Sequence, residues 1–222
     1  MIEKLKETGR LNSTVLLIFL SLFSVTLSLI RIIYTGSLKF LFLDWNLFLA
    51  FVPWLISSII ILCKLQNKKT LLLVLILSWL LFFPNSPYIL TDLFHLRMTS
   101  QAPLWYDLIL ILSFAWTGLL YGFMSLKDIE KVMENYIGKG KTMYAAIAFL
   151  FISGFGIYIG RYLRWNSWDI FVSPFAMSHD ILSKLSEPIY HSRAIGLTIF
   201  IGFLLNLIYF SLKYFNSQGQ KN

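Results

Sequence analysis

Six long apolar runs that contain no charged residue constrain this chain more than any other feature. The runs cover residues 11–30, 45–63, 70–91, 108–126, 142–160 and 194–212, and they are 20, 19, 22, 19, 19 and 19 residues long. About 20 helical residues, at ~1.5 Å rise each, cross the ~30 Å hydrocarbon core of a bilayer. Each run is therefore long enough for one span and too short for two.

The overall composition agrees with a membrane protein. Hydrophobic residues make up 57% of the chain and charged residues only 14%, against roughly 45–50% and about 25% in soluble domains. The runs are continuously apolar and do not alternate with period two, which favours helices over a β-barrel. The sequence predicts an all-α, polytopic transmembrane bundle of six spans that forms a single integral membrane domain over residues 1–222.

The distribution of Lys and Arg predicts the orientation of the spans. The N-terminus, residues 64–69, residues 127–141 and the C-terminus hold 12 of these residues, and the three connections on the other side hold 7. Because cytoplasmic loops retain an excess of Lys and Arg, both termini are expected in the cytoplasm. The protein is expected in the plasma membrane. The net charge of +8 then reflects topology and attraction to anionic lipid, and no nucleic-acid partner is expected.

The two sides differ more sharply in the kinds of charge than in their number. Eleven of 13 Lys fall on the predicted inner side, whereas 5 of 6 Arg, 5 of 6 Asp and all 3 His fall on the outer side. Lys is a flexible, solvated surface charge, while Arg, Asp and His are groups that proteins position in sites. The outer side is therefore expected to carry any functional site, and the inner side to be an ordinary solvated surface.

The stretch FFPNSPYILTDLFHLR, residues 82–97, interrupts the third run near its outer end. Pro84 and Pro87 each remove a backbone donor and clash with the carbonyl four residues earlier, so the helix is expected to break there. Unwound backbone at membrane depth occurs only inside protein or beside water. Asn85 and Ser86 are therefore candidate ligand-binding residues of a polar cavity, and the alternative is a packed proline kink.

Beyond the break, Thr91 is expected to cap a short helix that places Asp92 and His95 on one face. Such a pair suits proton transfer, metal ligation or a structural interaction with Arg97 or Arg161. Two ligands do not make a metal site, so none is predicted, and any cofactor stays open. The candidate catalytic residues are Asp92, His95 and Asp107; further outer-side polar residues are Asp44, Asp169, His179 and Asp180.

A second polar concentration, GRYLRWNSWD at residues 160–169, follows the fifth run. Arg161 and Arg164 are three residues apart, so they are expected on a common helical face. Guanidinium groups there suit a phosphate or carboxylate, including an anionic lipid head group, and equally suit Asp92, Asp107 or Asp169 as internal partners. Arg161, Arg164 and Asp169 are therefore candidate ligand-binding residues.

Two shorter helices are expected outside the spans. On the outer side, Ser173 and Pro174 are typical of a helix start, and the apolar segment at about 170–187 is expected to lie in the interface or to cover the site as a lid. On the inner side, Ser125 and Asp128 form a capping-box pattern, and residues 125–141 are expected to form a separate surface helix that ends at Gly138.

Three stretches are distinctive enough to carry a resemblance: LFFPNSPYILTDLFHL, WYDLILILSFAWTGLLYGFMSL and GIYIGRYLRWNSWDI. Together they resemble the bacterial integral membrane proteins grouped as domain-of-unknown-function family 1361, from about residue 40 to about residue 210. The resemblance implies a polytopic bacterial membrane protein and brings no activity with it.

Three functional classes stay open on the sequence. The first is a structural membrane protein whose polar outer groups pair with one another. The second is a membrane-embedded enzyme that acts on a lipid-linked or phosphate-bearing substrate. The third is a protein that binds or transports a small polar or anionic ligand, which a polar path past Asn206 would favour. The expected partners are the bilayer and, for a functional outer site, an anionic or lipid-linked ligand on the outer face; the oligomeric state is open.

Overall fold

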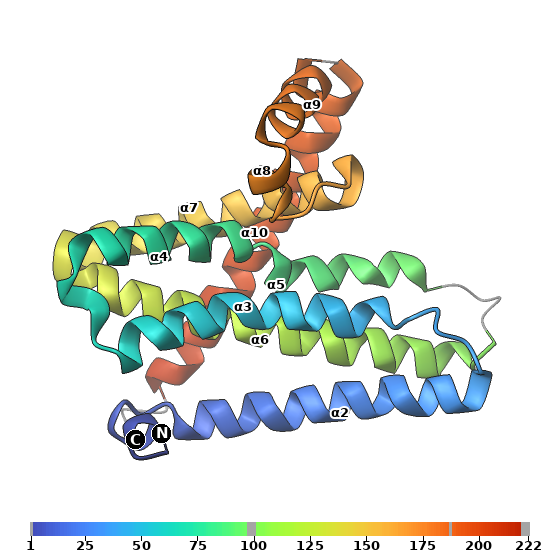
Figure 1. The fold of residues 1–222 in the computed structure, drawn as a ribbon, viewed down its shortest axis with the longest axis horizontal. Helices are drawn as coiled ribbons and strands as arrows, with labels where there is room; N and C mark the ends of the chain where they lie inside the picture. The colour runs from blue at the N-terminus through green and yellow to red at the C-terminus, as the bar shows by residue number, and fades with distance from the viewer. Residues whose placement is uncertain (1, 97–100, 187, 219–222) are drawn as a thin grey trace. The chain divides into compact units, whose positions relative to one another are not determined.

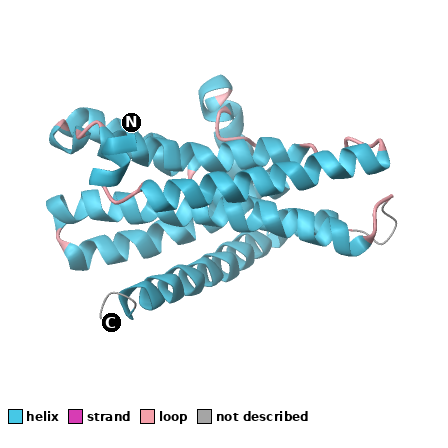
Figure 2. Ribbon diagram, turned by 90° about the horizontal axis from the view of Figure 1, so that it is seen from below, coloured by secondary structure: helices cyan, strands magenta, loops and turns pink. Residues whose placement is uncertain are grey.

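Every regular element in the described part of the chain is a helix (Figure 1, Figure 2). The computed structural model describes residues 2–96, 101–186 and 188–218. Within these described residues, six helical segments are long and apolar enough to cross a membrane, which confirms the predicted all-α, multi-pass architecture. They are Leu11–Thr35, Phe42–Leu62, Lys69–His95, Leu104–Ile137, Lys139–Leu163 and Ser192–Phe215.

The chain forms two compact units, Met1–Val132 and Met133–Asn222. Packing within each unit follows from its own contacts. The single membrane domain expected over the whole chain stays a prediction.

The first unit is built around α3, which lies against α2, α4 and α5. Buried apolar side chains from α2, α3, η2 and α6 form its core, with Leu43, Ile89 and Phe114 fully enclosed. Lipid tails are as apolar as these side chains, so van der Waals packing and hydrogen bonds hold such a core together. The elements are α1 (Ile2–Glu7), α2 (Leu11–Thr35), α3 (Phe42–Leu62), η1 (Leu65–Asn67), α4 (Lys69–Phe82), α5 (Asn85–Tyr88), η2 (Ile89–His95) and α6 (Leu104–Ile137).

The third span changes its helical form at the predicted break. The regular helix α4 ends at Phe82, and a single turn, α5, is followed by the 3₁₀ segment η2. The chain stays helical through Pro84 and Pro87, so it tightens instead of unwinding. The expected helix start at Thr91 was wrong: Thr91 lies inside η2, and its hydroxyl donates to the Tyr88 carbonyl.

The expected separate inner helix over residues 125–141 was also wrong. Helix α6 runs without interruption to Ile137, and only its end before Gly138 was predicted correctly. Ser125 is buried inside this helix, where its hydroxyl donates to the Gly122 carbonyl and accepts from the Trp79 indole. The capping pattern was misleading because a buried serine can bond to its own helix backbone.

Small residues allow α6 to approach α5 closely. A Cβ atom added at Gly118 would lie 2.8 Å from the Ser86 carbonyl oxygen, and one added at Gly122 would lie 2.8 Å from the Ser86 Cβ. Backbone contact of this kind is typical of membrane helices, whose interfaces are rich in Gly and Ser.

The second unit is dominated by the packing of α7 against α10. A Cβ atom added at Gly154 would lie 2.8 Å from the Thr198 carbonyl oxygen, and one added at Gly202 would meet the Phe151 ring. These glycines are therefore sites of close helix contact, as expected for small residues within spans. The elements wholly within this unit are α7 (Lys139–Tyr158), η3 (Ile159–Leu163), α8 (Asp169–Val172), α9 (Pro174–Ser186) and α10 (Pro188–Gln218).

The connection between the last two spans contains the predicted extra helix. Helix α9 begins at Pro174, and the Ser173 carbonyl accepts from the Met177 amide. The Trp165 indole donates to Asp180 Oδ2 at 2.7 Å and so fastens α9 to the segment before α8. Whether α8 and α9 lie in the interface or cover a site stays a prediction.

Candidate functional site

Four helix ends of the first unit meet at a group of acidic side chains, here called the Asp92 end. Ser28 near the end of α2 donates to Asp44 at the start of α3, and Asn46 of α3 donates to Asp92 of η2. Asp107 at the start of α6 completes the group. Successive spans run in opposite directions, so residues that were predicted on one side of the membrane come together here.

Asp107 forms a buried ion pair with Arg31. Arg31 Nε donates to Oδ1 at 2.7 Å and Nη2 approaches Oδ2 at 3.4 Å, and each side chain is only 1% exposed. The guanidinium also lies 4.4 Å from the centre of the Phe40 ring. Removing one member of such a pair typically costs about 3–5 kcal/mol, because the other charge stays buried. Asp107 therefore holds α6 to α2.

Asp92 is buried at the centre of this end. Its side chain is 1% exposed, and its Oδ2 accepts from Asn46 Nδ2 at 2.9 Å. A buried carboxylate needs such donors because it has lost its hydration. Sequence reasoning missed Asn46, since 46 positions separate it from Asp92 and only the folded chain brings them together.

His95 lies against Asp92, as the three-residue spacing predicted. Its Nδ1 is 3.3 Å from the Asp92 carbonyl oxygen and 3.7 Å from Asp92 Oδ1. The Phe42 ring lies 5.0 Å from the imidazole, centre to centre. Unlike Asp92, the His95 side chain is 42% exposed. A fixed carboxyl group and an accessible imidazole thus share one turn.

The contact at Nδ1 determines which nitrogen of His95 can react. A carbonyl oxygen only accepts hydrogen bonds, so the bond requires a proton on Nδ1. In the neutral ring, Nε2 then carries the lone pair and can accept a proton or bind a metal. In the described residues, no group of three His, Cys, Asp or Glu side chains is arranged to hold a metal ion.

Asn85 bonds within its own turn, and Ser86 bonds to a neighbouring helix. The Asn85 amide donates to the Phe82 carbonyl at 2.9 Å. Ser86 is fully buried, and its hydroxyl donates to the Ala50 carbonyl of α3 at 3.0 Å. Burial and a bond to the neighbouring helix are consistent with a packed kink.

The remaining candidate ligand-binding residues belong to the second unit. Arg161 lies in the π-helical turn η3, and Arg164 ends it in a left-handed conformation with φ 61°. The two therefore do not continue one regular helix, and the expected common helical face was wrong. Asp169 Oδ2 accepts from the Asn166 amide at 2.6 Å and so stabilises the turn before α8. The predicted meeting of Arg161 with Asp92 stays a prediction, and Arg97 lies outside the described residues.

A second ion pair, whose side chains are largely but not fully buried, lies at the other end of the first unit, where an ordinary solvated surface was expected. Arg10, before α2, pairs with Asp128 of α6 and donates to Ser58 Oγ at 2.6 Å. Asp128 also accepts from Ser57 Oγ at 2.9 Å. The expectation failed because Arg10 was counted only as one charge among the basic residues of the N-terminus. Arg10 and Asp128 are 118 positions apart, so no short-range sequence pattern could predict their contact.

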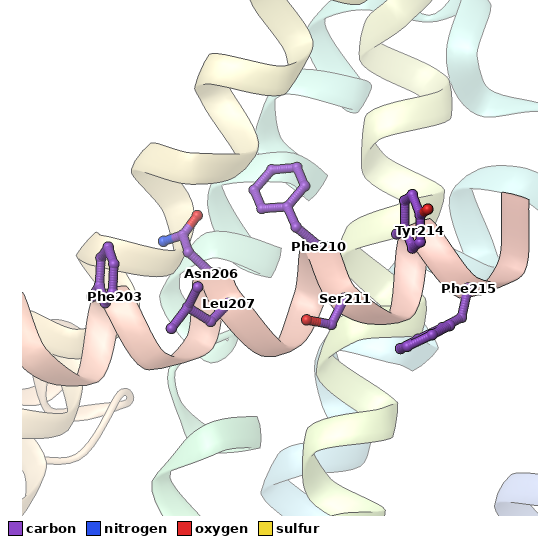
Figure 3. Close-up of a pocket in the computed structure, with 7 residues that line it drawn as sticks. All are labelled: Phe203, Asn206, Leu207, Phe210, Ser211, Tyr214 and Phe215. Atoms are coloured by element: carbon purple, nitrogen blue, oxygen red, sulfur yellow. The ribbon is translucent and has the colours of Figure 1, made fainter.

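One face of α10 forms a groove of about 380 Å³. Its lining is mostly aromatic, and Asn206 is its most deeply buried polar member. The Asn206 amide donates to the Gly202 carbonyl of the same helix at 2.8 Å. A transport path past Asn206 stays a prediction. Figure 3 shows the lining residues, which are Phe203, Asn206, Leu207, Phe210, Ser211, Tyr214 and Phe215.

Comparison with known proteins identifies a family but no characterised relative. No curated protein and no solved structure matches the chain. The model of one family, described as "Protein of unknown function (DUF1361)", matches residues 45–208, which is well over half of the chain. The matched range includes Asn46, Asp92, His95 and Asp107 of the Asp92 end and excludes Arg31. The protein belongs to the DUF1361 family.

Proposed function

We propose that this multi-pass membrane protein carries a proton-accepting site at the Asp92 end of its first unit, with His95 as the general base. The observation that carries the proposal is the contact between His95 Nδ1 and the Asp92 carbonyl oxygen. It leaves Nε2 as the basic nitrogen of an accessible imidazole. A general base needs both a free lone pair and access to its substrate.

The surroundings of His95 support a positioned group. Asp92 is held by Asn46, and its Oδ1 lies 3.7 Å from His95 Nδ1. In many enzymes, a carboxylate beside a catalytic histidine holds the imidazole in its orientation. The Phe42 ring packs against the imidazole, with 5.0 Å between the ring centres, and restricts its orientation.

The orientation of the protein and the class of substrate are part of the proposal. The excess of Lys and Arg in the connections at the opposite end supports an orientation with the Asp92 end on the outer face of a bacterial cell membrane and both termini in the cytoplasm. A substrate that reaches His95 there comes from the membrane surface or the lipid. A lipid-linked or phosphate-bearing molecule fits this position.

Replacing His95 by Asn tests the proposal. The Asn side chain can retain a hydrogen-bond donor near the position of Nδ1, but it is not a base at neutral pH. We expect His95→Asn to keep the thermal stability of the wild type in detergent and to fail to complement a deletion of the gene. The exposed His179 provides the control, and His179→Asn should complement. Full complementation by His95→Asn would refute the general base.

A purely structural role is the second candidate. It is favoured by the hydrogen bonds of four acidic residues in the first unit, since Asp44, Asp92, Asp107 and Asp128 each accept from a neighbouring side chain. Under this alternative, His95→Asn complements, and substitutions at the ion pairs lower stability and complementation together.

A further inference from the structure

A cavity of about 280 Å³ lies between the end of α2 and the start of α6. Its walls are mostly apolar and aromatic, and no residue of the Asp92–His95 pair lines it. The site is therefore separate from the proposed general base. The lining residues are Ile30, Arg31, Tyr34, Ala102, Pro103, Trp105 and Tyr106.

The rim of the cavity has the composition of a membrane interface. Tyr34 and Trp105 are 72% and 62% exposed, and Tyr and Trp prefer the boundary between lipid tails and head groups. Tyr106 is fixed in the wall, because its hydroxyl donates to the Leu27 carbonyl at 2.8 Å. Both helices are candidate spans that end or begin beside the cavity. The molecules most concentrated at such a position are bilayer lipids.

Arg31 makes the cavity more than a gap between apolar side chains. Its guanidinium is buried, lies against the Phe40 ring and is balanced by Asp107. A guanidinium has five N–H donors in one plane and can donate to several acceptors at once. Because the carboxylate offsets its charge, the cavity offers hydrogen-bonding character without a strong net positive field.

We infer that this cavity binds one bilayer phospholipid, with part of an acyl chain against the aromatic wall and the glycerol and head-group oxygens toward Arg31. Its volume of about 280 Å³ is slightly below the ~300–1,000 Å³ of typical ligand sites, so it holds part of the lipid and leaves the rest in the bilayer. Because Arg31 is balanced by Asp107, binding depends on the shape of the lipid and little on the charge of its head group.

The test is native mass spectrometry of the full chain released from nanodiscs of phosphatidylcholine or of phosphatidylglycerol. The wild type is expected to retain one lipid in both kinds of nanodisc. Because Arg31 is balanced by Asp107, the retained fractions of the two lipids should differ by less than about threefold. Ala102→Phe fills the cavity from its buried wall. It should lower the retained fraction at least about tenfold, equivalent to about 1.4 kcal/mol.

The matched control is Ala148→Phe, which adds the same ring to an exposed position of α7 and should retain lipid like the wild type. If Ala102→Phe does not fold, Ile30→Trp fills the same cavity from α2 and replaces it. Equal retention by the wild type and the filled variant, or no retained lipid in the wild type, would overturn the inference. Retention of phosphatidylglycerol alone would overturn it too, because it would indicate an anion site. None of these outcomes bears on His95.

Discussion

Arg10 and Asp128 lie 118 positions apart in the sequence and form an ion pair within the first unit. The guanidinium also lies 5.3 Å from the centre of the Trp54 ring, so one side chain contacts both α3 and α6. The segment that precedes the first span is therefore anchored to the bundle and is more than a topological signal.

Replacing this arginine should destabilise the protein. We expect Arg10→Gln to lower the free energy of unfolding by about 3 kcal/mol, since the substitution leaves the Asp128 carboxylate buried without its counter-charge. The exposed Lys6 provides a control with the same change of charge, and Lys6→Gln should change stability by less than about 0.5 kcal/mol. Equal thermal unfolding of the two variants in detergent would show that the pair contributes nothing.

The two arginine–aspartate pairs also show where sequence reasoning reaches its limit. The six spans could be predicted because the length of each charge-free run can be read directly from the sequence and matches the thickness of a bilayer. The proximity of Asp92 and His95 could be predicted because three residues make almost one helical turn. Arg10 with Asp128, Arg31 with Asp107, and Asn46 with Asp92 could not, because helix packing alone brings them together.

Local backbone geometry was the other limit. Arg161 and Arg164 have helical spacing, but the α-helix ends at Tyr158, Arg161 lies in a π-helical turn, and Arg164 is itself left-handed. Ser125 and Asp128 have the pattern of a capping box, yet both lie within one continuous helix. In each case, tertiary packing overrides a short-range signal, as it commonly does.

The break in the third span should behave as a packed kink. Ser86 is fully buried and bonded to the Ala50 carbonyl. In a Cys63→Ser background, Ser86→Cys should resist a water-soluble thiol reagent under native conditions and react after denaturation. Rapid labelling of the native protein from outside would instead indicate a water-filled cavity, as the binding and transport alternative requires.

Two glycines of the second unit should respond oppositely to the same substitution. Gly154→Ala places a Cβ 2.8 Å from a backbone oxygen of α10, and overpacking of this kind typically costs about 1–3 kcal/mol. Gly196 lies in helix α10 with nothing within 4 Å of its added Cβ, so Gly196→Ala should stabilise by up to about 1 kcal/mol through helix propensity. Thermal unfolding distinguishes the two. A Gly154→Ala variant as stable as Gly196→Ala would contradict the close packing of α7 on α10.

The proposed orientation gives a direct expectation for reporter fusions. Six spans and an inner excess of Lys and Arg place residues 66, 134 and 222 on the cytoplasmic side. Fusions of a reporter that is active only in the cytoplasm should therefore be active at all three positions. A fusion at residue 38 is the control and should be inactive. An inactive C-terminal fusion, with the protein stably expressed, would overturn the even number of spans or the orientation.

The most direct test of the proposed base is the position of the proton on His95. Nitrogen-15 NMR of the histidine-labelled protein in nanodiscs, at a pH where the imidazole is neutral, distinguishes a protonated ring nitrogen from a bare one. The signals of the 3 histidines are assigned by single His→Asn variants. The contact of Nδ1 with the Asp92 carbonyl predicts a proton on Nδ1 and a bare Nε2. A proton on Nε2 with a bare Nδ1 would contradict the proposal, because the accessible nitrogen would then be unable to act as a base.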